Sequence, residues 1–322
     1  MNQRHSSLLS LWLVPGLVGL LLRLVGAWSG IGPFAADDYT WGIEWGYNWF
    51  LDPELPFDSA FRSPLMGWGI ASAMEVGHFL GMRDPVVLLQ WAYCLLGVVS
   101  VGSIPAACAL ASEKFDSQHG KAAAWLVAIF PLMPRITTRA LIGVVAMLPI
   151  LWGFVWLERS LKSPERASVK AIAAAILLGI GALVRYQVGI LYVAVLMGLM
   201  ALWLFGPKGK SFRGPLLGWF SGGLVVLLLQ GMVDWWSGRV PLEGIANYLT
   251  HNVSNSSNYG TSPWWTYLLH FTVYAFGPLA FLMAKSFWKT LRSWLWLSLP
   301  FGSFVLIHSL VPHKEERFMF PV

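Results

Sequence analysis

Apolar stretches about as long as a bilayer is thick recur along this 322-residue chain. A membrane-spanning helix needs roughly 20 consecutive apolar residues. Runs of that kind extend from Leu8 to Trp28, Val86 to Ala111 and Leu216 to Trp236, separated by short polar loops. With 56% hydrophobic and only 12% charged residues, the composition excludes a water-soluble globular class. The chain is predicted to be an all-α polytopic membrane protein, with a single transmembrane domain over residues 1–322.

The charges of the loops predict which side each one faces. Lys and Arg in short loops mark the cytoplasmic side, and four such regions are basic: the N-terminus, 158–170, 206–213 and 285–292. The loop 29–62 is the opposite. It holds six of the sixteen acids: Asp37, Asp38, Glu44, Asp52, Glu54 and Asp58. We therefore expect it outside or in a lumen. The net charge is +6, but the basic residues are spread over short loops between apolar runs. This charge therefore gives no reason to expect nucleic-acid binding.

The number of crossings then has to fit this assignment. Four apolar stretches lie between the external acidic loop and the internal loop at 158–170. Because these loops are expected on opposite sides of the membrane, the number of crossings between them must be odd. Pro64 to Gly81 is the weakest because it carries Glu75 and His78, so it is predicted to be a helix at the outer surface. The pattern then predicts about nine spans and the start of a tenth. External regions are expected at 29–85, with surface helices, and at 237–263.

The first external loop carries the first candidate chemical groups. A carboxylate near a dry membrane interface, such as Asp37 or Asp38, can serve as a general base for an acceptor hydroxyl. An ordinary solvated loop acid is the alternative. Aromatic residues between Tyr39 and Phe50 form either an interface belt or stacking surfaces for a sugar. Arg62 suits a phosphate, with anchoring to lipid headgroups as the alternative.

Three arginines lie within or beside apolar segments: Arg23, Arg139 and Arg185. A cation at membrane depth is costly and indicates a function or a partner. Arg23 is expected to pair with a neighbouring helix. Asp234, at the end of its span, is the nearest candidate counter-charge for one of the three.

A charged cluster follows the apolar run Leu295 to Val311. It reads His313-Lys314-Glu315-Glu316-Arg317 and leads directly into apolar residues again. Its cations suit a phosphate leaving group, while its glutamates can orient those cations or contact sugar hydroxyls. Headgroup anchoring is the alternative. Residues 318–322 are typical of the first turn of a further span, so we expect a chain that is cut short.

Two motifs carry a resemblance to a known family. One is the cluster His313 to Phe318 followed by Phe320-Pro321, and the other is Tyr259-Gly260-Thr261-Ser262-Pro263-Trp264, preceded by Asp234. Together they resemble the dolichyl-phosphate-mannose-dependent α-mannosyltransferases of glycosyltransferase family 22, in the GT-C superfamily. The resemblance runs along nearly the whole chain. It departs at Ala36-Asp37-Asp38, where the family has Pro-Asp-Glu, and at Arg185-Tyr186, where it often has Arg-Pro.

The resemblance implies an inverting displacement on a polyprenyl-phosphate-linked mannose, with a glycan or glycolipid as acceptor. Asp37 would be the base and Asp38 a stand-in for the family's glutamate. The phosphate and donor contacts it implies are Arg62, Arg185, His313, Lys314, Glu315 and Arg317. The acceptor or sugar contacts it implies are Glu44, Trp45, Asp234, Tyr259 and Trp264. Neither a metal nor a cofactor is implied. The expected location is the endoplasmic reticulum membrane in a eukaryote, or the inner membrane in a bacterium.

Two other functions remain open at this stage. One is a GT-C transferase that uses a different polyprenyl-linked sugar, and the other is a transporter or lipid flippase. Transporters favour broken helices and polar groups at mid-membrane. The polar clusters here gather at one external face instead, which favours the transferase.

Overall fold

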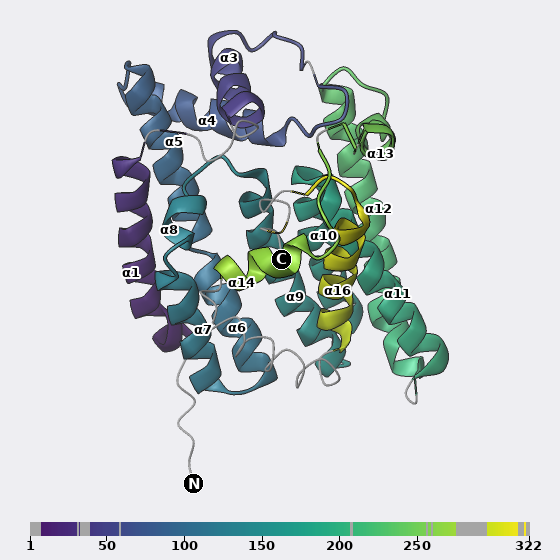
Figure 1. Ribbon diagram of the computed structural model, residues 1–322. Helices are drawn as coiled ribbons and strands as arrows, with labels where there is room; N and C mark the ends of the chain where they lie inside the picture. The colour runs from purple at the N-terminus through teal and green to yellow at the C-terminus, as the bar shows by residue number, and fades with distance from the viewer. Residues whose placement is uncertain are drawn as a thin grey trace.

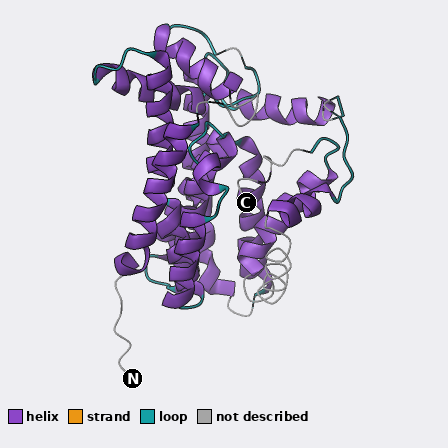
Figure 2. Cartoon of the chain, turned by 60° about the vertical axis from the view of Figure 1, so that its left-hand side comes forward, coloured by secondary structure: helices purple, strands orange, loops and turns teal. Residues whose placement is uncertain are grey.

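The computed structural model describes residues 8–30, 32, 39–57, 59–206, 209–255, 257–258, 260–274, 295–314 and 319. Throughout these ranges the ordered elements are helices and none is a strand (Figure 2). Long helices stand side by side, and some of the short ones lie across one end of the bundle (Figure 1). The prediction of an all-α fold is confirmed for this part of the chain.

Six helical segments are long and apolar enough to cross a membrane. Three of them are single helices: α1 (Leu8–Ser29), α9 (Ile142–Lys162) and α10 (Ala167–Val184). The other three are built from consecutive pieces: α5 (Pro85–Ser100) with α6 (Ser103–Lys114), η2 (Tyr186–Val188) with α11 (Gly189–Phe205), and η3 (Gly209–Phe212) with α12 (Arg213–Trp236). The chain is thus built as a multi-pass membrane protein.

Other predicted spans are shorter than expected or are only partly described. The stretch 122–134 forms α7 (Ser117–Ile129) and the single turn α8 (Met133–Ile136). Pro131 explains the break, since a proline disfavours helical geometry in the residue before it and Phe130 has a ψ of 122°. Near the end, α14 (Thr266–Tyr274) and α16 (Leu295–Leu310) are described, while 275–294 and the start of the tenth span lie outside the described residues. Nine spans remain a prediction.

The weak apolar stretch after the first loop forms α4 (Leu65–Phe79), which lies across the ends of the long helices together with α3 (Trp45–Leu51) (Figure 1). The two cross closely because Gly46 has no side chain: a Cβ there would come within 2.6 Å of the Ile70 side chain. Above this crossing, Trp45, Trp49 and Phe57 form a buried aromatic cluster.

The core of the bundle is formed by α9, α10 and α12. Small residues allow the backbones of α10 and α12 to approach closely, as is common between membrane helices. A Cβ on Gly218 would lie 2.3 Å from the carbonyl oxygen of Ser168, and one on Gly222 would lie 2.6 Å from Cβ of Ala175. This packing holds α10 and α12 side by side, and the C-terminal ends of these helices carry Arg185 and Asp234.

Arg23 is fully buried in α1 and is satisfied by neighbouring helices, as predicted. Its Nε donates to Ser100 Oγ of α5 at 3.0 Å, and its Nη2 donates to the Val127 carbonyl of α7 at 3.3 Å. A third bond returns to the Gly19 carbonyl at 3.1 Å. The guanidinium therefore links three helices through neutral acceptors, and Asp234 is not among its partners.

Candidate functional site

Two loops that are far apart in sequence meet at the end of the bundle where α4 lies. The second loop carries α13 (Glu243–Asn255), and it is joined to the last residues of the first loop. Arg239 Nη2 donates to the carbonyl of Arg62 at 2.9 Å, and Asn247 Nδ2 donates to that of Ala60 at 3.2 Å. The rings of Phe61 and His251 stack with their centroids 3.9 Å apart. The two loops therefore form one continuous surface.

A buried ion pair lies beneath this junction. Asp234, at the end of α12, is fully buried, and its Oδ1 lies 3.3 Å from Arg239 Nη1. Gln230 donates to Asp234 Oδ2 at 2.9 Å and lies 3.1 Å from the Tyr186 hydroxyl. The counter-charge of Asp234 is thus Arg239, which corrects the expectation that it serves Arg23, Arg139 or Arg185.

Local backbone geometry brings Arg239 back toward Asp234. Gly238 follows the last turn of α12 with a φ of +79°, a left-handed conformation that glycine adopts without strain. The N–H of Arg239 then donates to the Asp234 carbonyl at 2.8 Å, as in a Schellman-type helix end. Sequence reasoning missed Arg239, although Gly238, two residues beyond the end of α12 at Trp236, is a signal for this reversal.

Gly244, in the first turn of α13, lies against the same network. A Cβ built on it would come within 2.6 Å of Asp234 Oδ1, 2.6 Å of the Tyr186 hydroxyl and 2.7 Å of Arg239 Nη1. Three polar groups from three segments of the chain thus converge on a position that only glycine leaves open. The close approach of α13 depends on this residue.

Two of the predicted phosphate contacts, Arg62 and Arg185, lie near Tyr248 in α13, whose ring is 5.6 Å from that of Tyr186, the residue after Arg185. Burial raises the pKa of the Tyr248 hydroxyl, while the positive charges of Arg185 and Arg62 and a hydrogen bond with Gln187 oppose that rise. Arg62 also lies over the Trp41 ring, 5.3 Å from its centroid. The structure therefore brings both charges close enough to act on one residue, although 122 intervening residues separate Arg62 from Arg185 in the sequence.

The two motifs that carry the family resemblance also meet. Lys314 Nζ donates to the carbonyl oxygens of Ser262 at 2.9 Å and Val311 at 2.7 Å. The Ser262 N–H donates to the Pro312 carbonyl at 2.9 Å. Lys314 is 9% exposed, and burial lowers its pKa. Its ammonium group holds the segment before α14 against the segment after α16, and His313 beside it is half-buried.

The remaining candidate contacts differ in accessibility. Trp45 is buried in the aromatic cluster, with its ring 4.9 Å from that of Phe57. Glu44 is exposed at the end of the π-helical turn η1 (Tyr39–Glu44), and Trp264 is 66% exposed. Five predicted site residues lie outside the described residues: Asp37, Asp38, Tyr259, Glu315 and Arg317.

Arg139 lies against the end of α1, directly before the loop that carries the two predicted acids. It is 6% exposed, its guanidinium carbon lies 4.6 Å from the Tyr93 ring centroid, and Nη2 is 3.5 Å from the Gly26 carbonyl. Burial lowers its pKa. A Cβ on Gly30, at the end of α1, would clash with this guanidinium. Arg139 thus packs against the chain directly before the loop.

The acids and histidines do not gather into a possible metal site. Over the described ranges, no three His, Cys, Asp or Glu side chains lie close enough together to hold an ion. The two cysteines, Cys94 and Cys108, are free thiols. Over the described residues, this surface offers guanidinium groups, the Lys314 ammonium group, the exposed Glu44 carboxylate, backbone carbonyls and aromatic rings.

Comparison with known proteins gives a family match over most of the chain. The family described as the Alg9-like mannosyltransferase family matches residues 59–322. The α-1,2-mannosyltransferase alg9 of Schizosaccharomyces pombe is 33% identical over 150 residues, which are 40% of this chain and 26% of that protein. GPI mannosyltransferase 4 of Debaryomyces hansenii is 37% identical over 81 residues, 24% of this chain and 14% of that protein. These matches span about a quarter and a seventh of the two relatives. No solved structure matches.

Proposed function

Since this chain belongs to the Alg9-like mannosyltransferase family, we propose that it transfers a mannosyl residue from a polyprenyl-phosphate-linked donor to a glycan or glycolipid acceptor. The observation that carries the proposal is the junction of the two loops, where Arg239 bonds the Arg62 carbonyl and the ring of Tyr186, next to Arg185, lies 5.6 Å from that of Tyr248. A guanidinium offers a planar set of donors that matches a phosphate. Two of them at this junction form a cationic site at the end of the bundle, which suits a phosphate on a lipid.

The reaction is a single displacement with inversion at the anomeric carbon. The acceptor oxygen forms a bond to that carbon, while the bond from the carbon to the phosphate oxygen breaks. Asp37 takes the proton of the acceptor hydroxyl, with Asp38 beside it. Negative charge develops on the leaving polyprenyl phosphate, and cations that face it stabilise the transition state more than the bound donor.

The leaving phosphate is bound by Arg62 and Arg185, together with His313, Lys314 and Arg317 of the C-terminal motif. Lys314 already bonds two backbone carbonyls, which supports a role in holding this motif beside Ser262. Glu315 orients the neighbouring cations. Placing the motif against the segment 260–264 would bring both to the same side of the donor.

The acceptor is proposed to contact exposed groups of the two loops. Glu44 and Trp264 are accessible, and Tyr259 belongs to the same motif as Trp264. Trp45 and Asp234 are buried, so their part would be to support this surface: Trp45 through the aromatic cluster, and Asp234 through Arg239.

The proposed topology places the reaction on the external or luminal face. The N-terminus is cytoplasmic, and residues 29–62, 237–263 and 313–317 face outward. The gathering of α3, α4 and α13 at one end of the bundle supports this arrangement (Figure 1). In a eukaryote the membrane would be that of the endoplasmic reticulum, and in a bacterium the inner membrane.

Membranes that contain the chain test the proposal when they are incubated with radiolabelled polyprenyl-phosphate-mannose. We expect label to enter lipid-linked glycans, and membranes with an Arg62→Ala, Arg185→Ala double variant to transfer little. Polyprenyl-phosphate-glucose is tested in parallel as a control donor that differs from the mannose donor only in its sugar. Transfer of glucose but not of mannose would replace the proposal with the reading that the enzyme uses another polyprenyl-linked sugar.

A further inference from the structure

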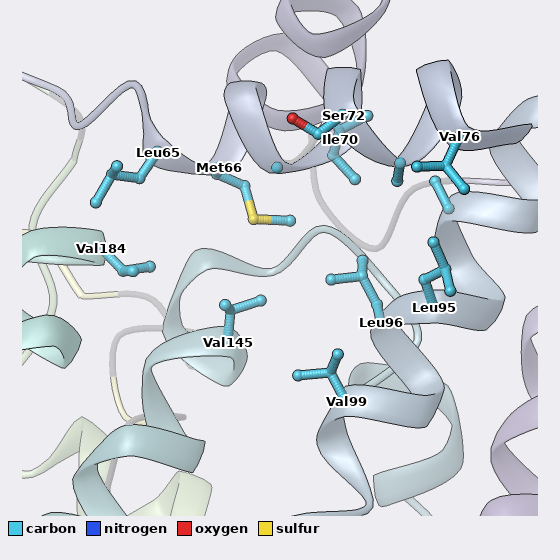
Figure 3. Close-up of a pocket in the computed structure, with 13 residues that line it drawn as sticks. Leu65, Met66, Ile70, Ser72, Val76, Leu95, Leu96, Val99, Val145 and Val184 are labelled. Atoms are coloured by element: carbon cyan, nitrogen blue, oxygen red, sulfur yellow. The ribbon is translucent and has the colours of Figure 1, made fainter. Parts of the chain in front are cut away.

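A cavity of about 350 Å³ lies beneath α4, between this transverse helix and the upper parts of α5, α9 and α10 (Figure 3). Its lining is almost entirely aliphatic. Ser72 carries the one hydroxyl group among the side chains that line it. Those labelled in the close-up include Met66 and Ile70 of α4, Leu96 and Val99 of α5, Val145 of α9 and Val184 of α10.

The pocket is partly open to the outside of the bundle, because Gly69, Ser72 and Val76 on its α4 side are exposed. Gly69 shows how open it is, because a Cβ built on this lining residue meets no atom within 4 Å. An aliphatic cavity offers nothing to bind water, but it gives an apolar chain both burial and dispersion contacts. Its volume is within the range of small-molecule sites, roughly 300–1,000 Å³.

One end of the cavity adjoins the cationic site. Val184 is the residue before Arg185, and Leu65 follows Arg62 by three positions. Figure 3 shows Leu65 and Val184 on the same side of the cavity. A ligand whose negatively charged head is bound by Arg62 and Arg185 would therefore extend an apolar chain from that head into the space under α4.

We propose that this cavity holds the first isoprene units of the donor's polyprenyl chain, with α4 lying over them. The inference rests on the proposed function, and it adds where the chain of the donor is bound. Continuity with Arg62 and Arg185 selects this occupant over an acyl chain of the bilayer, because a phosphate directly joined to the chain satisfies both halves of the site at once. In this arrangement α4 selects the donor by the shape of its chain.

Filling the cavity tests the assignment. Gly69→Leu places a side chain in the open space, and Gly302→Leu is the matched control, since Gly302 is an exposed glycine of α16 whose Cβ also meets nothing. Mannose donors with a farnesyl-phosphate or an ethyl-phosphate group are compared. We expect Gly69→Leu to raise the KM for the farnesyl donor about tenfold, because burial of its chain is lost, and to leave the KM for the ethyl donor unchanged. Equal effects on both donors, or none, would overturn the assignment.

A second measurement uses the unaltered chain and needs no transfer. Farnesyl phosphate with a photoreactive diazirine on its second isoprene unit is cross-linked to the protein, and the labelled peptides are identified by mass spectrometry. Label on α4 or α5 supports the assignment, whereas label confined to α11 or α16 overturns it. Cavity labelling without mannosyl transfer would count against the proposed function alone. Mannosyl transfer without cavity labelling would count against the cavity assignment alone.

Discussion

Arg239 pairs with Asp234 across the turn at the end of α12, with 3.3 Å between Nη1 and Oδ1. Both side chains are almost completely removed from solvent, at 8% and 0% exposure. The other amino group of Arg239 donates to the Arg62 carbonyl. One guanidinium therefore neutralises a buried acid and also fixes the backbone of a residue proposed to bind phosphate.

Breaking this pair from one side should be costly. Removing one member of a buried ion pair leaves an uncompensated charge and costs about 3–5 kcal/mol. We expect Arg239→Leu and Asp234→Leu each to lower the free energy of unfolding by that order in detergent. The double variant Asp234→Leu, Arg239→Leu should lose less than the sum of the two, because neither charge remains. Strictly additive losses in thermal unfolding would mean that the two charges do not interact.

Gly244→Ala should destabilise the contact between the loops and α12. The added methyl group would lie 2.6 Å from Asp234 Oδ1 and from the Tyr186 hydroxyl, and overpacking of this kind costs roughly 1–3 kcal/mol. Gly189→Ala is the control, since a Cβ there meets nothing within 4 Å. Proteolysis of the 237–263 loop, followed over time, should be faster in Gly244→Ala than in the control. Equal rates would show that α13 shifts to accommodate the methyl group.

Asp37→Asn should retain the fold but lose turnover. If Asp37 takes the proton of the acceptor, transfer should fall by about a hundredfold or more, as for other general bases. Asp38→Asn is the neighbouring control and should have the smaller effect. Transfer rates at saturating donor and equal protein amounts measure both. Near-normal transfer by Asp37→Asn, with a large loss in Asp38→Asn, would move the role to Asp38.

The proposed topology can be checked by chemical labelling in intact cells or sealed vesicles. With Cys94 and Cys108 replaced by Ser, cysteines introduced singly at Asp58 and Asn255 should react with an impermeant thiol reagent from the outer side. A cysteine at Lys162, in the predicted internal loop, should react only after permeabilisation. Labelling of the Asp58 or Asn255 position only after permeabilisation would contradict the assignment of sides from loop charge.

The sequence predicted the helical class and several local features, because these depend on the composition of continuous stretches. The apolar runs form long helices. Glu75 and His78 led to the prediction of a surface helix at 64–81, where α4 lies across the end of the bundle, and its place at the outer surface of the membrane stays a prediction. The stretch at 122–134 was harder, because its apolar composition favours a span while Pro131 interrupts the helix. Composition alone does not say which of the two effects prevails.

The site was predicted less completely because its contacts join distant segments. Arg62 and Arg185 were singled out as phosphate contacts, but nothing in their spacing shows that both approach Tyr248. Arg239 was missed, and Asp234 was expected to pair with one of three other arginines. The actual pairing depends on the positive φ of Gly238, which turns the chain back on the helix it has just left. From charge alone, any of four arginines could have been the partner of Asp234.

The contact between Lys314 and Ser262 limits how members of this family could be recombined. Lys314 donates to a backbone carbonyl of the other motif, and Ser262 donates in return to the backbone of Pro312. Because both acceptors are main-chain carbonyls, the match depends on the path of each segment as well as on the Lys314 side chain. A chimera that takes residues 260–264 from one parent would therefore need residues 311–314 from the same parent, and insertions in either segment should be tolerated only with a compensating change in the other.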